Sequence, residues 1–218
     1  MIIKIDKGRL FTVGDIHGCF DELEAALADV NFDKEVDTLI AVGDLVDRGP
    51  KSDEVEFYLD QPWFHSIMGN HEAMCHPAFA GTYWHVMNGG QWINDFADNY
   101  SDLAKRNLGE RLCALPLWIE AHFNGKRFGF VHASVCGLRN WDEIKEVAGQ
   151  YNKMDEHPFA WDRADFRDIL NGKGALIQGI DHVYFGHTPV KEPFHKDNCS
   201  WIDTGAFATG KLTVMEVV

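Results

Sequence analysis

The chain has 218 residues, of which 45% are hydrophobic and 25% are charged, and its formal net charge is −14. These values are typical of a globular protein with a full hydrophobic core. The negative charge disfavours nucleic acid as a partner, and no apolar run approaches the roughly 18 residues of a membrane helix. Five widely spaced cysteines without a C-x-x-C motif predict free thiols, and the N-terminus does not resemble a signal peptide. We therefore expect a cytoplasmic, monomeric protein with a single domain over residues 1–218, without a membrane partner.

The first part of the chain alternates strand-like and helix-like segments. Residues 9–13 (RLFTV), 38–42 (TLIAV) and 64–68 (FHSIM) predict strands because they are short apolar runs. Residues 21–30 (DELEAALADV) predict a helix, since their apolar side chains recur on one helical face. Residues 52–59 (SDEVEFYL) predict a second helix, with acidic residues in its first turn.

The middle of the chain is predicted to be mostly helical. Residues 72–79 predict a helix that is interrupted at Pro77, and residues 83–115 predict further helices. Residues 117–131 predict two strands around Asn124-Gly125, the strongest short signal for a β-hairpin.

The last part of the chain combines a helical region with short strands. Residues 140–171 predict helix and loop, whereas residues 182–185, 199–203 and 212–218 predict strands. Early β-α-β alternation followed by a hairpin predicts an α/β fold. Its strands would form a mixed sheet, or two packed sheets, with helices outside.

Five of the predicted strands end in polar side chains, most of them directly after a glycine. These side chains are Asp15, His17, Asp44, Asn70, His71, His132 and His187. In α/β sheets, ligands bind beyond the carboxyl ends of the strands. Glycine lets the backbone turn sharply and approach a ligand closely. We therefore expect five loops to converge on one site. A single Asp or His in a loop is usually structural, but five coincidences of this kind are improbable.

The chemistry of this set predicts a centre with two divalent cations. Oxygen and nitrogen ligands without thiolate suit Mn, Fe or Zn in a catalytic site. Two ions about 3.5–4 Å apart form a clamp for displacement at phosphorus. We expect Asp15 and His17 to hold one ion and Asp44 to bridge both. The ligands of the second ion would be Asn70, His132 and His187.

The residues around this set predict a phosphate clamp and a proton donor. Arg48 follows Asp44 by four residues, and its guanidinium can bind phosphate oxygens in bidentate fashion. Asp47 is expected to lie behind His71, because a carboxylate fixes the tautomer of an imidazole. His71 would then protonate the leaving alkoxide as a general acid.

The other polar and aromatic residues are interpreted as structural. Arg163 is equally consistent with a surface arginine, and the tryptophans with core packing. Seven histidines are interpreted as surface or packing residues, namely His65, His76, His85, His122, His157, His182 and His195. Among these, His76 is the one that lies close to the predicted site in the sequence.

The motifs GDIHG, GDLVDRG, GNHE, HA and GHTP resemble those of the PPP family of metal-dependent serine/threonine phosphatases. Their order and spacing look most like the small bacterial and phage members, of the bacteriophage lambda phosphatase type. The resemblance implies a calcineurin-like sandwich of four layers, α/β/β/α, and a two-metal centre. It also implies that a metal-bridging hydroxide attacks phosphorus without a phospho-enzyme. Phage-type members carry a second phosphate clamp in a Trp-x-Arg stretch, which matches Trp161 and Arg163 here.

The resemblance implies phosphoprotein substrates. The residues hydrolysed would be phosphoserine and phosphothreonine, and possibly phosphotyrosine. Manganese is the ion expected to support activity in vitro. Eukaryotic members carry a Ser-Ala-Pro-Asn-Tyr stretch where this chain reads DTGAF, residues 203–207. Their substrate grooves and regulatory subunits are therefore not carried over.

Three alternatives to a protein phosphatase remain open. A symmetrical diadenosine tetraphosphate hydrolase has similar motifs, but Asp47 and Glu72 favour the protein phosphatases. A metal-dependent nuclease is disfavoured by the net charge of −14. A binding module derived from a dead phosphatase would need a lost ligand, and every expected ligand is present.

Overall fold

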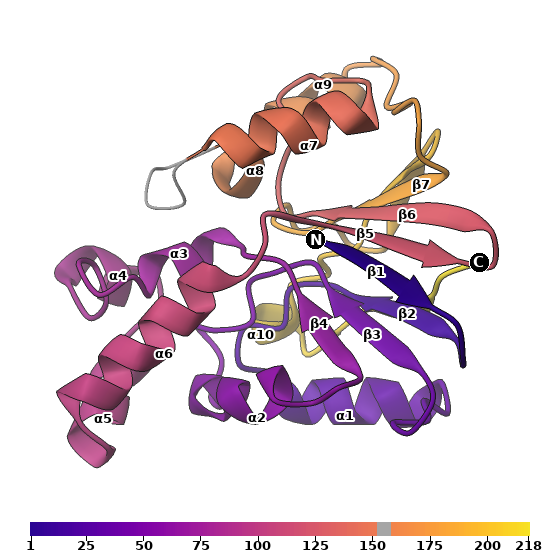
Figure 1. Ribbon diagram of the computed structural model, residues 1–218. Coiled ribbons are helices and arrows are strands. Elements are labelled where there is room, and N and C mark those ends of the chain that lie inside the picture. The colour runs from indigo at the N-terminus through magenta and orange to yellow at the C-terminus, as the bar shows by residue number, and fades with distance from the viewer. Residues whose placement is uncertain (152–157) are drawn as a thin grey trace.

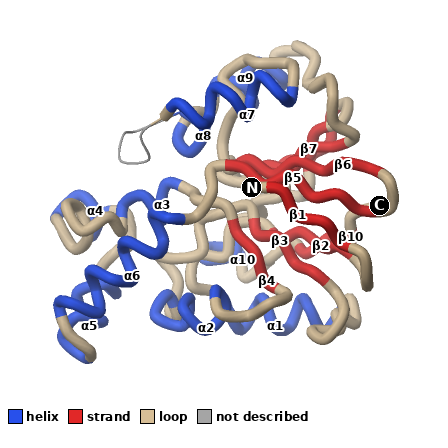
Figure 2. Tube along the Cα trace, viewed as in Figure 1, coloured by secondary structure: helices blue, strands red, loops and turns tan. Residues whose placement is uncertain are grey.

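The computed structural model describes residues 1–151 and 158–218. Its strands form two sheets that lie face to face, with helices on both outer sides (Figures 1 and 2). One sheet has the strand order β1-β5-β6-β7-β9-β8, and the other has the order β10-β2-β3-β4. Both sheets contain parallel and antiparallel pairs. The predicted α/β architecture, with two mixed sheets between helical layers, is confirmed.

The strands in the described residues are β1 (Ile2–Ile5), β2 (Leu10–Val13), β3 (Thr38–Ala41), β4 (Phe64–Ser66), β5 (Trp118–Phe123), β6 (Lys126–Val131), β7 (His182–Phe185), β8 (Phe194–Lys196), β9 (Cys199–Trp201) and β10 (Val214–Glu216). The helices are α1 (Phe20–Asp29), the 3-10 helix η1 (Ser52–Glu54), α2 (Val55–Leu59), α3 (Asn70–Met74), α4 (Tyr83–Met87), α5 (Trp92–Asn99), α6 (Asp102–Ala114), α7 (Trp141–Gln150), α8 (Pro158–Trp161), α9 (Ala164–Leu170) and α10 (Ala206–Thr209). Within the described ranges, none of these helices is long and apolar enough to cross a membrane.

Three groups of buried apolar side chains fill the spaces between the four layers. In β3, Ile40 points to the six-stranded sheet, where it packs in one cluster with Ile119 and Phe130. Its neighbours Leu39 and Ala41 belong to the cluster on the other side, under α1 and α2. This alternation is the period of two of a strand that is buried on both faces.

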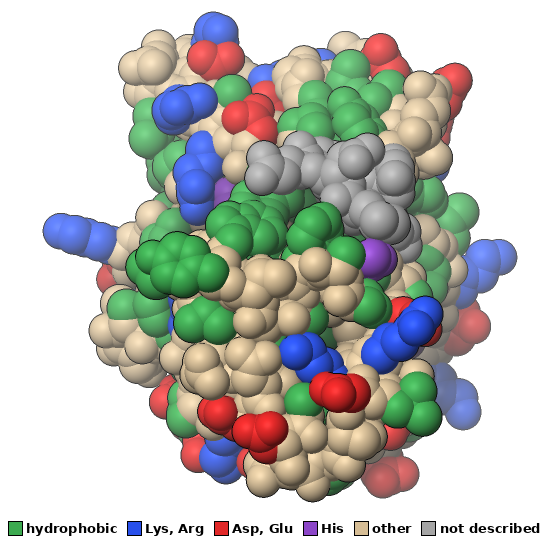
Figure 3. Space-filling view, turned by 90° about the vertical axis from the view of Figure 1, so that its left-hand side faces the viewer, with side chains coloured by type: hydrophobic (Ala, Val, Ile, Leu, Met, Phe, Trp, Pro, Cys, Tyr) green, Lys and Arg blue, Asp and Glu red, His purple; other side chains and the backbone are tan. Residues whose placement is uncertain are grey.

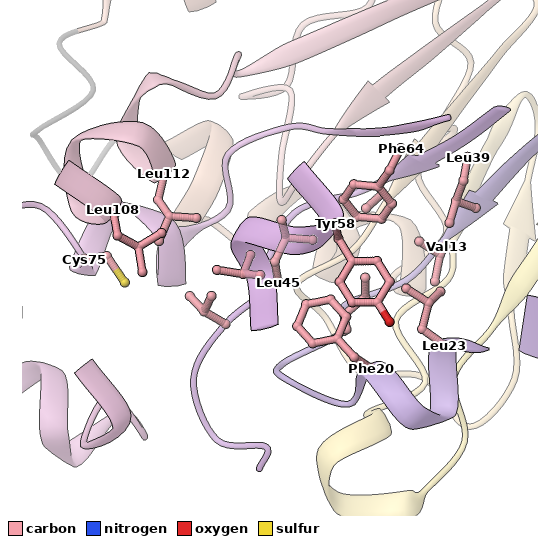
Figure 4. Packing of buried hydrophobic residues seen from close by; sticks show 14 of the residues in the cluster. Val13, Phe20, Leu23, Leu39, Leu45, Tyr58, Phe64, Cys75, Leu108 and Leu112 are labelled. Carbon is pink, nitrogen blue, oxygen red and sulfur yellow. The ribbon is translucent and has the colours of Figure 1, made fainter. Parts of the chain in front are cut away.

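The hydrophobic cluster on the outer face of the four-stranded sheet also packs against α1, α2, α6 and the end of α3. Phe20 of α1 stacks on Tyr58 of α2, with ring centroids 4.2 Å apart (Figure 4). Leu108 and Leu112 lie one turn apart on α6 and point toward Cys75, the residue that follows α3 (Figure 4). The packing of α6 therefore holds α3, which carries the GNHE motif, against the sheet.

The structure differs from the predicted elements at several short segments. The strands β1 and β8 and the helix α10 were not predicted. The helix predicted over residues 72–79 ends at Met74, three residues before Pro77, which has no backbone N–H with which to continue a helix. The predicted hairpin is confirmed: Asn124 and Gly125 have φ angles of 50° and 76° and join β5 to β6.

Candidate metal centre and phosphate site

The carboxyl ends of β2, β3, β4, β6 and β7 meet at one end of the sandwich (Figure 1). The backbone N–H of His17, after β2, donates to the carbonyl of Asp44, after β3, at 2.8 Å. The N–H of His71, after β4, donates to the Asp44 carboxylate at 3.0 Å. The N–H of Gly186, after β7, donates to the carbonyl of His132, after β6, at 2.8 Å. These bonds join the loops after β2, β3 and β4 and, separately, the loops after β6 and β7. The N–H of His187 joins the two sets, since it donates to the carboxylate of Asp15, after β2, at 2.9 Å.

The backbone at this end is unusually strained. Positive φ angles occur at His17 (47°), Asp44 (51°), Asp47 (70°), Arg48 (70°) and His187 (64°). A residue other than glycine in this region costs of the order of 1 kcal/mol or more, and such residues gather at functional sites. The gathering of such residues in these loops agrees with a functional role for this end of the molecule.

The carboxylate of Asp44 lies between two groups of ligand atoms. Its Oδ1 lies 3.3 Å from Nε2 of His132, and its Oδ2 lies 3.6 Å from Nε2 of His17. In each group all ligand atoms lie within 4.8 Å of one another: one group joins Asp44 to His17 and His71, and the other joins it to His132 and His187. Because Asp44 belongs to both groups, its position suits the bridging role that the sequence predicts.

Hydrogen bonds orient the imidazoles of His17 and His132 as a metal requires. Each ring donates from Nδ1 to a backbone carbonyl, His17 to Val46 at 3.0 Å and His132 to Val42 at 2.6 Å. The Nε2 atom of each ring therefore lies on the side of Asp44. Burial lowers the pKa of His17 to about 3, so this ring is neutral at physiological pH. The neutral ring of His17 is thus in the form that binds a cation. At His132 burial is outweighed by the neighbouring Asp44 carboxylate, which raises the pKa of the ring.

The residues predicted to hold the second ion lie close to one another. The Oδ1 of Asn70 lies 3.2 Å from Nε2 of His132. His187 donates from Nε2 to the carbonyl of Trp161 at 3.1 Å, which leaves its Nδ1 free to accept. Burial lowers the pKa of His187 to about 3, so it too is neutral. The amide oxygen and the two imidazoles can therefore serve as ligands.

Several carboxylates are buried together at this site. Asp15 is 1% exposed and accepts the N–H of His187 at 2.9 Å. Burial, together with the charges of Asp203 and Asp44, raises the pKa of Asp15 well above its usual value. Burial also raises the pKa of Asp203, which the sequence analysis had not placed at the site. Crowded, buried carboxylates are costly unless a cation compensates them, so the donor set fits divalent metal.

Metal binding is expected to stabilise the protein measurably. Manganese at about 100 times its dissociation constant should add about 2.7 kcal/mol, which raises Tm by about 5–10 °C for a chain of this size. The change should shrink in His17→Asn and persist in His195→Asn, whose side chain is exposed on β8. Thermal denaturation with and without manganese measures this increase in Tm. Equal increases in the two variants would contradict the assignment of His17 as a metal ligand.

Glu72 holds the loop that carries Asp44. Its Oε2 accepts the N–H groups of Asp44 and Gly69, both at 2.8 Å, and its Oε1 accepts the N–H of Leu45 at 2.7 Å. Sequence analysis used Glu72 only to compare families and did not predict this role. Only its bond to Gly69 had a signal in the sequence, because a Glu three residues after the residue that precedes a helix has the spacing of a capping box.

His71 and Asp47 form the predicted pair. Nδ1 of His71 donates to Oδ2 of Asp47 at 2.7 Å, and both side chains are fully buried. Nε2 of His71 is buried without a hydrogen-bond partner in the part of the chain that the structure describes, and lies 3.9 Å from Oδ2 of Asp44. The imidazole therefore presents one ring nitrogen to the site and anchors the other on Asp47.

Two exposed arginines stand at the edge of the site. Nη1 of Arg48 donates to Nε2 of His17 at 2.8 Å, and its guanidinium lies 4.8 Å from the ring centroid of Phe207. Arg163 donates from Nη2 to the carbonyl of His187 at 3.1 Å. Both arginines that were predicted to bind phosphate therefore lie beside predicted metal ligands. Phe207, from the DTGAF stretch, was not predicted.

An apolar rim borders the site on the side of α4 and α8. The ring of Trp84 stacks on that of Trp161, with centroids 5.7 Å apart. Tyr83 and Met87 are largely exposed, and Figure 3 shows hydrophobic side chains gathered on this face of the molecule. Trp84 and Trp161 therefore belong to the surface near the site, whereas the sequence analysis had interpreted the tryptophans as core.

The histidines that were interpreted as structural include one that reaches the site. His85 is fully buried, and its Nε2 lies 3.0 Å from both carboxylate oxygens of Asp47. Sequence analysis interpreted it as a surface or packing residue, and that interpretation missed this contact. His76 instead accepts the N–H of Ala78. His157 lies outside the described residues.

Comparisons with known proteins agree with this geometry. The family model of calcineurin-like phosphoesterases matches residues 8–191. The chain is 34% identical over 214 residues to serine/threonine-protein phosphatase 1 of Salmonella typhimurium, covering 96% of this chain and 92% of that protein. It is 52% identical over 64 residues, only 28% of this chain, to the symmetrical bis(5'-nucleosyl)-tetraphosphatase of Hamiltonella defensa.

The fold is also shared with solved structures. The cold-active protein-tyrosine phosphatase of a psychrophilic Shewanella species superposes with a TM-score of 0.65 over 99% of this chain and 77% of that one, at 18% sequence identity. Together with the family match and the 34% identity over most of the chain, these comparisons show that the protein belongs to the calcineurin-like phosphoesterase family.

Proposed function

We propose that this protein hydrolyses phosphoserine and phosphothreonine esters in proteins, with two divalent cations as cofactors. The observation that carries the proposal is the carboxylate of Asp44, which is shared by two groups of potential metal ligands and lies beside the His71–Asp47 pair. The relatives that match this chain over 96% of its length are named serine/threonine-protein phosphatases, which supports a phosphoprotein as the substrate.

We propose as ligands of the cations the residues that the sequence predicts for this role. The first ion would be held by Asp15 and His17, and the second by Asn70, His132 and His187, with Asp44 between them. Bound cations of this kind supply positive charge to phosphate oxygens and make water acidic enough to act as a nucleophile at neutral pH. Manganese is the ion we expect to support activity in vitro, and iron and zinc have suitable ligand chemistry as well.

The chain's own residues would bind the phosphate and move a proton. Arg48 and Arg163, both exposed at the edge of the site, would hold phosphate oxygens through their guanidinium groups. Asn70 and His71 begin α3 and would contact the same phosphate. His71 would donate a proton from Nε2 to the leaving alkoxide, while Asp47 stabilises the protonated imidazole through Nδ1.

The main alternative is a symmetrical diadenosine tetraphosphate hydrolase. Relatives with that name share 48–52% identity with this chain, but over only 28–33% of its length. The phosphatase relatives match nearly the whole chain, including the segments that carry His132 and His187. The wider coverage therefore favours a phosphoprotein substrate.

A substrate comparison tests the proposal directly. Metal-stripped protein, with and without added Mn²⁺, would be given a phosphoserine peptide, a phosphotyrosine peptide and diadenosine tetraphosphate. We expect manganese-dependent phosphate release from the phosphoserine peptide and little cleavage of the dinucleotide. Preferential cleavage of the dinucleotide would leave the metal site intact but overturn the proposed substrate.

The cellular compartment, the domain organisation and the oligomeric state are also proposed. All five cysteines are free thiols in the structure, which is typical of proteins from a reducing cytoplasm. Both sheets contribute ligands to the same site, which supports residues 1–218 as one domain. A monomer without a nucleic-acid or membrane partner is the simplest arrangement, and the charge of −14 supports it.

A further inference from the structure

We propose that Trp92 and His85 are positioning residues: they hold the carboxylate of Asp47 by hydrogen bonds and so keep Nε2 of His71 directed at the phosphate ester. His85 lies in α4 and Trp92 begins α5, so both lie outside the motifs GDIHG, GDLVDRG, GNHE, HA and GHTP. The inference rests on the proposed function, because it concerns how the proposed proton donor is oriented.

Three side chains donate hydrogen bonds to the buried carboxylate of Asp47. Nδ1 of His71 reaches Oδ2 at 2.7 Å, Nε1 of Trp92 reaches Oδ1 at 2.6 Å, and Nε2 of His85 lies 3.0 Å from both oxygens. An ionised carboxylate can accept about four hydrogen bonds. His85 and Trp92 thus fix its plane, and a carboxylate with a fixed plane fixes the imidazole that it binds.

The tautomer of His85 supports this role. Its Nδ1 accepts the N–H of Gly81 at 3.1 Å, so the proton of the neutral ring is on Nε2, which faces Asp47. The ring is also tightly enclosed, since a Cβ atom on Gly90 would lie 2.1 Å from it. His85 is therefore held rigidly as a donor.

The same geometry argues against a third metal site. Ligand atoms of Asp47, Cys75 and His85 lie within 4.8 Å of one another. However, the ring nitrogen of His85 that faces this group carries the proton and lacks a free lone pair. The oxygens of Asp47 already accept three hydrogen bonds. Positioning is therefore the better explanation of the cluster.

The segment that supplies these donors also contacts the phosphate clamp. The carbonyl of Gly89 accepts the backbone N–H of Arg48 at 3.1 Å, and a Cβ atom on Gly89 would lie 2.7 Å from that nitrogen. Residues 85–92 thus support both Asp47 and Arg48. This one segment therefore helps to fix the relative positions of His71, the proposed proton donor, and Arg48, the proposed phosphate ligand.

Trp92→Phe tests the inference by removing one N–H group while keeping an aromatic ring. We expect kcat on a phosphoserine peptide to fall about 10-fold, with unchanged KM and bound manganese. The loss should be smaller on para-nitrophenyl phosphate, whose leaving group needs little protonation. Trp63→Phe is the matched control, because Trp63 is buried in the core without a contact to Asp47 in the described residues, and it should leave both rates unchanged.

A second pair of variants keeps the test informative if one protein folds poorly. His85→Gln retains a side-chain N–H and should keep more activity on the peptide than His85→Leu, which cannot donate. Equal losses on both substrates in Trp92→Phe, or no loss on the peptide, would overturn the positioning role alone. Failure of the unmodified protein to release phosphate from the peptide would overturn the proposed function and this inference with it.

Discussion

Replacement of Asp44 by asparagine is expected to lower phosphate release by at least about 10³-fold. A bound cation contributes several kcal/mol of transition-state stabilisation, and each 1.4 kcal/mol corresponds to about a factor of ten. The amide side chain would keep the size of the carboxylate and an oxygen that accepts the N–H of His71, but it lacks the second anionic oxygen that faces His17. Turnover on a phosphoserine peptide and bound manganese, measured by elemental analysis, should fall together.

Asp37→Asn is the control for this change. Asp37 is also a buried carboxylate, but it pairs with Arg9 at 2.6 Å near the start of β3, at the opposite end of that strand from Asp44. The control variant should be less stable yet retain bound manganese and turnover. Full manganese content and near-normal turnover in Asp44→Asn would show that Asp44 does not bridge the cations.

Replacement of His71 by asparagine is expected to separate proton donation from metal binding. Loss of a general acid costs about 10²–10⁴-fold in rate, so turnover on a phosphoserine peptide should fall by that amount. Manganese content should stay the same, because the bond from residue 71 to Asp44 comes from the backbone N–H. The loss should be much smaller on para-nitrophenyl phosphate, since its leaving group departs without a proton.

His76→Asn provides the comparison for His71. His76 lies five residues further along, and among the described residues its side chain accepts a local hydrogen bond, from the N–H of Ala78. Its replacement should change neither rate, which would also confirm that this histidine lies outside the site. Equal losses of His71→Asn on the two substrates would refute the general-acid role.

The position of the site was predictable because it depends on local rules. The run TLIAV is apolar throughout, so it becomes a strand that is buried on both faces, and Asp44 follows where that strand ends. Carboxyl ends of parallel strands lie at one edge of a sheet, and β2, β3 and β4 are parallel. The gathering of Asp15, Asp44 and Asn70 follows from these two facts alone.

The partners of the site residues were not predictable in the same way. Trp92 donates to Asp47 across 45 positions in the chain, and Glu72 accepts the N–H of Asp44 across 28. No spacing or periodicity marks such pairs, because they depend on how α3, α4 and α5 pack beside the sheet. For the same reason His85 could not be distinguished from an ordinary core histidine.

By itself, the sequence determined most of the strands, the polar residues at their ends and the family to which the motifs point, because sterics, hydrophobic period and turn chemistry act over a few residues. The tertiary structure alone decided which side chains orient those residues: Glu72 behind Asp44, and His85 and Trp92 behind Asp47. These contacts join segments that are distant in the chain. They form only when the burial of apolar faces, here the packing of α6 on α3, brings those segments together.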